Sequence, residues 1–329
     1  MPGQSQNKRR SHRETTPLPR PAGLCALTRR RATPYRHGRG NDPAKPGERR
    51  THSMIYDCFT FYNEFEVLDL RLRELAGVVD RFVLVEADTT HAGLPKPLFF
   101  EERKAEFAPY LDRITHIVVR DMPETTDSWV RENFQRNAIM RGLDGLKPDD
   151  IVLISDVDEI PRRSVIASLP GNGAVVSGLR MPLFYFKYNY LNIAGNDCMV
   201  VWTVAVRGSH IAQITPQGAR NARFALSQNP PANTRVYPHA GWHFSYIGDV
   251  EHVQRKLRNF AHQEYNDERF IEAIDIDRIV ASGADLYGRA GYAWTTVQAD
   301  DYFPDPLRAN FERYRPFVAE GAQHRIQTA

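Results

Sequence analysis

The stretch DDIVLISDVDE, residues 149–159, decides the fold class of this chain. It joins a short apolar run, 151–154, to three carboxylates, Asp156, Asp158 and Glu159. Such a run is typical of a strand that is buried on both faces of a parallel sheet. Three carboxylates this close together repel one another, so they need a compensating cation or a solvated loop. Which of the two compensates them is the main functional question that the sequence raises.

Strands and helices alternate along the chain before this stretch. Short apolar runs predict the strands, and apolar residues at helical spacing predict the helices. The predicted strands cover residues 54–61, 81–86, 114–119 and 149–155, and the predicted helices cover 63–75, 101–111 and 128–143. After Pro161, aromatic β-rich runs at 183–191 and 200–208 predict antiparallel strands, and helices follow at 249–264 and 267–281. We therefore predict an α/β protein with a Rossmann-type, mostly parallel sheet, helices on both faces and a β-rich second half.

Residues 1–53 differ in composition from the rest of the chain. They carry 13 Lys and Arg against 3 Asp and Glu, whereas the whole chain has a formal net charge of only +3. We predict that 1–53 form a disordered, basic Pro/Arg-rich extension and that 54–329 form one folded domain, which is mildly acidic. Two interpretations of the extension stay open: a tail that contacts a membrane surface or nucleic acid, or a non-essential segment ahead of a start at Met54.

Other totals narrow the class of protein. An acidic folded domain argues against nucleic acid as its partner. No stretch approaches the ~18 consecutive apolar residues of a membrane span. The three scattered cysteines, Cys25, Cys58 and Cys198, form neither a disulfide framework nor a zinc motif, which favours a reducing compartment. We therefore expect a cytoplasmic protein, either free or peripheral at the inner face of a membrane.

The carboxylates suggest a metal site. In an extended segment Asp156 and Asp158 point to one face, and carboxylate oxygens suit Mg²⁺ or Mn²⁺. They follow a buried strand, and open α/β sheets bind ligands at the carboxyl ends of their strands. A metal there would compensate the repulsion and neutralise a leaving diphosphate. The alternatives are an Asp-X-Asp that occurs by chance on an exposed loop and an aspartate that caps the next helix.

Several longer stretches resemble glycosyltransferase family 17. They are residues 54–102, beginning MIYDCFTFYNEFEVLDL, then WVRENFQRNAI at 129–139, PDDIVLISDVDEIPR at 148–162, GWHFSYIG at 241–248 and KLRNFAHQEYN at 256–266. The family includes N-acetylglucosaminyltransferases. The resemblance implies a GT-A-like catalytic domain over 54–329, a divalent metal (Mn²⁺ or Mg²⁺), a UDP-sugar donor, with UDP-GlcNAc preferred, and inversion at the anomeric carbon.

The resemblance also assigns roles around the metal. Asp156-Val157-Asp158 resembles the DXD motif, with Asp158 as the direct metal ligand and Asp156 nearer to the ribose or to the waters of the metal. His243 either completes the metal shell or is a core histidine that donates to a backbone carbonyl. Arg136 either reaches the donor phosphates and the carboxylates or forms an ion pair with Glu132 one helical turn away.

The remaining donor residues surround the expected nucleotide. Tyr62, Asn63 and Glu64 follow the first strand, where they contact base and ribose, unless Asn63 only caps the next helix. Glu86 ends the second strand and either binds uridine or braces the loop after it. Asn137 is grouped with the donor-binding residues of its helix.

The expected partners are a nucleotide-sugar donor and a glycan acceptor. Inverting transfer needs a base that takes the proton of the acceptor hydroxyl. The sequence does not choose among four candidates, which are Glu159, Asp197, Asp249 and Glu251. Two other functions stay open. One is a sugar-nucleotide nucleotidyltransferase, which usually has a Gly-rich basic loop after the first strand, and the other is a non-catalytic carbohydrate-binding protein.

Overall fold

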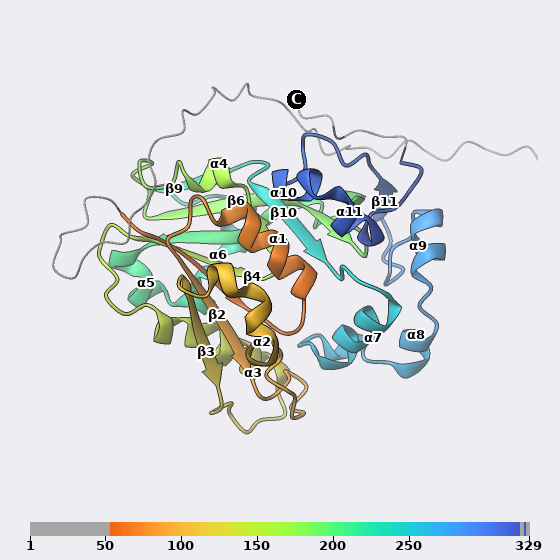
Figure 1. Cartoon of the computed structure of the whole chain (residues 1–329), viewed down its shortest axis with the longest axis horizontal. Coiled ribbons are helices and arrows are strands. Elements are labelled where there is room, and N and C mark those ends of the chain that lie inside the picture. The colour runs from red at the N-terminus through yellow and green to blue at the C-terminus, as the bar shows by residue number, and fades with distance from the viewer. Residues whose placement is uncertain (1–52, 323–325, 327–329) are drawn as a thin grey trace, which may run out of the picture.

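A computed structural model describes residues 53–322 and residue 326 of the chain. The predicted disordered extension therefore lies outside the described residues, except for Ser53. The described residues form an α/β fold around a sheet of 11 strands (Figure 1).

The N-terminal half builds a parallel sheet, as predicted. Its strands lie in the order β4-β1-β2-β3 and all run in the same direction. The strands are β1 Ile55–Thr60, β2 Arg81–Ala87, β3 Ile114–Val119 and β4 Ile151–Asp156. Between them lie α1 Phe65–Leu75, α2 Phe99–Arg103, η1 Lys104–Tyr110, α3 Ser128–Asn137 and η2 Ala138–Gly142. Each long helix predicted at 101–111 and 128–143 is thus divided into an α-helix and a 3₁₀ segment.

Helices cover both faces of this sheet because β1 and β4 are apolar on both sides. On one face Leu68, Leu72 and Leu75 of α1 pack against alternate residues of β1, β2 and β4. On the other face the next residues of the same strands pack against Ala138 and Ile139 of η2. They also pack against two later helices, α5 Gly208–Ile214 and α6 Pro216–Gln228. This confirms the doubly covered sheet predicted from the apolar runs.

The second half extends the sheet through β8, which pairs antiparallel to β4. Its elements are β5 Glu159–Pro161, α4 Arg163–Ile166, β6 Val176–Tyr185, β7 Tyr190–Ala194, β8 Met199–Arg207, α5 Gly208–Ile214, α6 Pro216–Gln228, β9 Thr234–Tyr237 and β10 Gly241–Ser245. The chain ends with α7 Val250–Asn259, η3 Gln263–Tyr265, α8 Glu268–Glu272, α9 Ile276–Ser282, β11 Ala293–Thr296, α10 Asp305–Ala309, α11 Phe311–Tyr314 and η4 Arg315–Phe317.

The antiparallel strands predicted at 183–191 and 200–208 are confirmed, because β6 pairs antiparallel to both β7 and β8. The strands β9 and β10 are absent from the sequence prediction, and both run parallel to β6. The helices α5 and α6 are also absent from the sequence prediction. The helices α7, α8 and α9 lie at the right of Figure 1, on the side of the molecule away from β3.

The pairing of β10 with β5 brings distant residues to the carboxylate stretch. The two strands are antiparallel, and their register places His243 opposite Glu159. The approach is close at Gly241, where a Cβ atom would lie 2.2 Å from the carbonyl oxygen of Ile160. A residue with a side chain there would push β10 away, so this glycine helps to bring His243 to the end of β4.

No helix among the described residues is long and apolar enough to cross a membrane. The cytoplasmic location and any contact with a membrane surface stay predictions.

Candidate functional site

A cavity of about 650 Å³ opens at the carboxyl ends of β1 and β4. Thr60 and Asp156, the last residues of these neighbouring strands, face each other in the sheet and both line the cavity. Other lining residues come from α3, α6, β10 and α7. The size is that of a small-molecule site, and the position is where open α/β sheets bind ligands.

Arg71 of α1 fixes the backbone beneath the carboxylates. Its guanidinium is fully buried and forms an ion pair with Asp57 of β1, with an N–O distance of 2.6 Å. The same group donates to the carbonyl oxygens of Asp156 and Glu159, at 3.0 and 2.9 Å. Charge-assisted hydrogen bonds from Arg71 to its backbone therefore fix the loop between β4 and β5.

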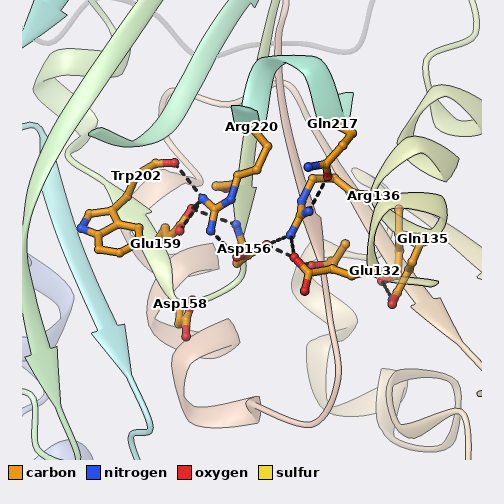
Figure 2. Close-up of polar contacts among 12 residues, drawn as sticks. Glu132, Gln135, Arg136, Asp156, Asp158, Glu159, Trp202, Gln217 and Arg220 are labelled. Carbon is orange, nitrogen blue, oxygen red and sulfur yellow. Dashed lines mark hydrogen bonds and ion pairs between the residues drawn. The ribbon is translucent and has the colours of Figure 1, made fainter. Parts of the chain in front are cut away.

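Asp156 and Glu159 are both neutralised by arginines. Arg220 of α6 lies between them, at 2.6 Å from Asp156 Oδ2 and 2.6 Å from Glu159 Oε1. Arg136 of α3 donates to the other oxygen of Asp156 at 2.9 Å and to Glu132 at 2.8 Å. Figure 2 shows Asp156 between the two guanidinium groups, while Asp158 points away from them.

Asp158 has a separate cation. Lys256 of α7 donates to its Oδ2 at 3.0 Å and also lies 3.3 Å from Glu64. His243 Nε2 lies 3.5 Å from Asp158 Oδ1. His243 Nδ1 is buried and has no hydrogen-bond partner in the described part of the chain, so it does not donate to a backbone carbonyl as a core histidine would.

The compensating charge thus comes from side chains that are distant in the sequence. Two simpler alternatives are wrong. The stretch is not a solvated loop, because Asp158 and Glu159 are buried, and it caps no helix, because the next helix begins at Arg163 after strand β5. The buried cation pairs mean that the carboxylates do not need a metal ion in order to coexist.

A metal ion nevertheless fits one part of the cluster. Among residues 53–322 and 326 no group of three or more His, Cys, Asp and Glu side chains is arranged to hold one. Asp158 Oδ1 and His243 Nε2 are close enough to share an ion, and Mg²⁺ often has only one or two protein ligands beside substrate phosphates and water. Asp156 fits less well, because arginines occupy both of its oxygens.

The pKa values of the three carboxylates shift in different directions, according to the balance between burial and neighbouring charge. Burial alone would raise the pKa of Asp156 and Asp158, but Arg220 and Arg136 at the first, and Lys256 and His243 at the second, hold both below the usual range. Burial raises the pKa of Glu159, and Arg220 only partly opposes it. The cavity thus presents Asp156 and Asp158 ionised at neutral pH.

These shifts predict a loss of stability in acid. A lowered pKa stabilises the fold fully above the usual value of 3.8, and this contribution is lost as the pH falls below it. Each such group changes the free energy of unfolding by at most about 1.4 kcal/mol per pH unit. The free energy of unfolding, measured with urea at several pH values between 5 and 2.5, should fall less steeply with decreasing pH for Asp158→Asn than for the wild type. Equal slopes would contradict a lowered pKa at Asp158.

The structure brings some of the predicted donor residues into the cavity and leaves others out. Tyr62 and Glu64 line it, as does Arg136. Asn63 does not line it and does not cap α1 either; its Oδ1 is buried without a hydrogen-bond partner among the described residues. Asn137 also lies outside the lining and accepts a hydrogen bond from the backbone of Gln217.

Glu86 does not line the cavity, which argues against contact with uridine. It is fully buried and accepts hydrogen bonds from the backbone N–H groups of Phe100 and Glu101 in the first turn of α2. It also lies 2.7 Å from His116. Its observed contacts are those of a residue that anchors α2, which follows the loop after β2.

The four candidates for the catalytic base differ in whether they line the cavity. Glu159 is fully buried and bound by Arg220, and it does not line the cavity. Asp249 caps α7 through the N–H of His252, and Glu251 is exposed on the same helix outside the cavity. Asp197, in the loop between β7 and β8, lines the cavity with 33% of its side chain exposed.

Sequence reasoning missed the cations of the site, Arg71, Arg220, Arg223 and Lys256. The helix that carries Arg220 and Arg223 had one detectable signal, Thr215-Pro216, because threonine is a common N-cap and proline a common first helical residue. Arg223 lines the cavity, and its Nη1 is buried without a hydrogen-bond partner in the described residues. Burial and the neighbouring Arg220 lower its pKa to about 10, so it still carries a charge at neutral pH.

Fold and site together define an α/β protein whose cation-rich cavity lies at the carboxyl ends of its parallel strands. The chain belongs to glycosyltransferase family 17, since the model of that family matches residues 45–297.

Similar proteins are known by sequence and by structure. Two relatives, both named beta-1,4-mannosyl-glycoprotein 4-beta-N-acetylglucosaminyltransferase, come from Rattus norvegicus and Homo sapiens. Each is 30% identical over 129 residues, which are 37% of this chain and 24% of the relative, so the match spans about a quarter of their length. A solved mannosyltransferase from Pyrobaculum calidifontis, in complex with GDP-Man and Mn²⁺, has a TM-score of 0.39 and 11% identity and covers 68% of this chain and 64% of its own.

Proposed function

We propose that this protein transfers a sugar from a UDP-sugar to a hydroxyl group of a glycan, with inversion at the anomeric carbon. The observation that supports this most strongly is the Asp156–Asp158 pair in the cavity of a family 17 chain. By analogy with the named relatives, the sugar is N-acetylglucosamine and the acceptor is a β-linked mannose of a glycoprotein glycan.

In this proposal the donor lies along the cavity from β1 to α7. Tyr62, Glu64 and Thr90 line the end next to β1 and β2, where they contact the base and the ribose. The diphosphate lies near Asp158, with Lys256 and Arg223 as the cations beside it. Arg136 and Arg220 act through Asp156, which they hold in place.

A divalent cation would be held by Asp158 and His243. When bound there, it would neutralise the negative charge that develops on the departing diphosphate. Lys256 and Arg223 supply fixed positive charge in the same cavity, and preorganised charge of this kind stabilises a leaving group without reorganisation.

Asp197 is the proposed base. The acceptor oxygen forms a bond to the anomeric carbon while the bond from that carbon to the diphosphate oxygen breaks. The proton of the hydroxyl goes to the carboxylate of Asp197, and UDP leaves with the bonding electron pair. Asp197 accepts a hydrogen bond from Tyr292 at 2.9 Å and another from Arg289 at 3.3 Å, which orient it in the cavity.

His243→Ala should raise the Mn²⁺ concentration that gives half-maximal UDP release. Removal of one of two protein ligands should cost roughly 10-fold or more in metal affinity, since even outer-shell partners contribute 10–100-fold. His210→Ala, which changes a histidine outside the cavity, is the matched control. An unchanged Mn²⁺ requirement with a lower Tm would show that His243 supports the core and binds no metal.

One assay separates this function from its alternatives. The protein is incubated with Mn²⁺, UDP-GlcNAc and a mannose-containing glycan, and the released UDP and the mass of the glycan are measured. Transfer predicts UDP together with a glycan heavier by one sugar. Pyrophosphate release from a nucleoside triphosphate and a sugar phosphate would indicate a nucleotidyltransferase, and glycan binding without turnover would indicate a binding protein.

A further inference from the structure

Trp129 is an exposed aromatic residue at the cavity. It is the second residue of α3, lines the cavity and leaves 41% of its surface exposed. Most large apolar side chains of a folded domain are buried, so an indole that stays open beside this cavity is available to a ligand.

Trp129 is held by one contact of its ring and by the hydrogen bonds that fix the start of its helix. Its ring meets His262 edge to face, with centroids 4.6 Å apart. The hydroxyl of the preceding residue, Ser128, donates to the carbonyl oxygen of Ala261 at 2.6 Å, which ties the start of α3 to the segment after α7. Asp127 caps the helix, because its side chain accepts a hydrogen bond from the backbone N–H of Trp129 at 2.8 Å. Trp129 therefore presents a rigid surface, and a rigid surface loses little entropy on binding.

The helix places this surface in line with the carboxylates. Trp129, Asn133 and Arg136 follow one another at spacings of four and three residues and share a face that lines the cavity. Arg136 contacts Asp156 at the far end of this face. The rise of the helix separates Trp129 from Arg136 by roughly 10 Å, so a ligand on Trp129 lies beside Asp156 and not on top of it.

The charged groups near Trp129 are paired. Glu132 lines the cavity and pairs with Arg136 at 2.8 Å, and His262 lies 2.6 Å from Glu264. Asn133 and Asn259 also line the cavity and offer amide groups. Arg258, on the same turn of α7 as Asn259, forms an ion pair with Glu268. An aromatic face beside amides suits a pyranose ring, which has an apolar C–H face and hydroxyls at its edge.

We propose that Trp129 is the platform of an acceptor subsite that binds one ring of a neutral glycan. This inference rests on the proposed function, because it assigns the second substrate of the same cavity. The ring on Trp129 is a neighbour of the sugar that receives the transferred residue. Asn133, one turn further along α3, is placed to bond its hydroxyls.

Binding can be measured without catalysis. Chitotriose, mannotriose and trigalacturonate are titrated calorimetrically into the UDP-saturated full chain, and the affinity for UDP is measured separately. The variants are Trp129→Ala, Trp129→Phe and, as a matched control, Phe311→Ala, an aromatic that is 37% exposed outside the cavity. Both Trp129 variants should fold, because Trp129 is exposed and because Trp129→Phe keeps an aromatic ring.

The expected result is specific. Trp129→Ala should weaken binding of at least one neutral trisaccharide roughly 10-fold, the value of one stacked apolar face. Trp129→Phe and Phe311→Ala should retain it, and UDP affinity should not change.

Three results would overturn the inference. The first is a fall in UDP affinity in Trp129→Ala, which would place the nucleobase on the indole. The second is a protein that binds trigalacturonate but neither neutral trisaccharide. The third is binding of the neutral trisaccharides that does not depend on Trp129. Failure of the proposed function looks different: the wild type would not bind UDP, while the trisaccharide would still bind in a Trp129-dependent way when UDP is absent.

Discussion

Replacement of Asp158 by asparagine should reduce sugar transfer by a factor of ~10²–10³, the usual cost of removing one preorganised electrostatic contact. Asparagine keeps the size of the side chain but removes the charge that faces Lys256 and His243. The proposed metal site loses its only carboxylate, so the diphosphate would leave without that neutralisation. Initial rates of UDP release at saturating UDP-GlcNAc measure the effect.

Asp158→Asn should also lower the free energy of unfolding. Repulsion among the three carboxylates alone would imply the opposite, a gain in stability when one charge is removed. In the structure Asp158 is buried against Lys256, and removal of one partner of a buried pair leaves an uncompensated charge. The loss should be smaller than the 3–5 kcal/mol typical of a fully broken buried pair, because Lys256 keeps Glu64 as a second partner. Urea unfolding at pH 7 measures it.

Glu251→Gln is the matched control for Asp158→Asn. Glu251 is an exposed carboxylate on α7 that does not line the cavity, so the variant should keep both activity and stability. Equal losses of transfer in the two variants would contradict a special role for Asp158. Full transfer by Asp158→Asn with a normal Mn²⁺ requirement would place the metal elsewhere.

Replacement of Arg220 by methionine should have the largest effect on folding. Arg220 bridges Asp156 and the fully buried Glu159, and without it both carboxylates lose a cation. We expect a loss of about 3–5 kcal/mol, or a fall in Tm of roughly 10 °C. Thermal unfolding followed by circular dichroism measures it.

The pH dependence of the Arg220→Met variant has a definite sign. Burial already raises the pKa of Glu159, and removal of Arg220 raises it further. A group with a raised folded-state pKa is protonated at no extra cost in acid and destabilises the fold as the pH rises through that pKa. The defect should therefore shrink when the pH is lowered from 8 towards 5.

Arg258→Met is the control for a lost ion pair. Arg258 pairs with Glu268 on the surface, and exposed pairs contribute only ~0–1 kcal/mol. If Arg258→Met and Arg220→Met lost equal stability, or if the defect of Arg220→Met did not change with pH, the bridge between Asp156 and Glu159 would not be the cause.

Local sequence patterns predicted the parallel half of the fold well. The strands β1 to β4 are short apolar runs, and α1 follows from Leu68, Leu72 and Leu75, so each element carries its own signal. The position of Asp156 at a strand end, and therefore in a cavity, followed from the same pattern. The strands β9 and β10 were not predicted, and their direction depends on chain crossings that leave no local period.

The neutralisation of the carboxylates could not be predicted in the same way. Arg220 and Asp156 are 64 residues apart, and Lys256 and Asp158 are 98 apart. A composition rich in arginine offers many equivalent partners, and only the fold selects among them. For the same reason the sequence left four candidate bases open. Of the four, Asp197 lines the cavity and Asp249 caps a helix.

The central claim is that Asp158 belongs to a metal-assisted site for the donor diphosphate. Calorimetric titration of UDP into the wild type and into Asp158→Asn, each with Mn²⁺ and with a chelator, tests it most directly. We predict that Mn²⁺ strengthens UDP binding to the wild type and that this gain disappears in Asp158→Asn, while the weaker metal-free binding remains. An equal gain from Mn²⁺ in both proteins, or a wild type that does not bind UDP, would contradict the claim.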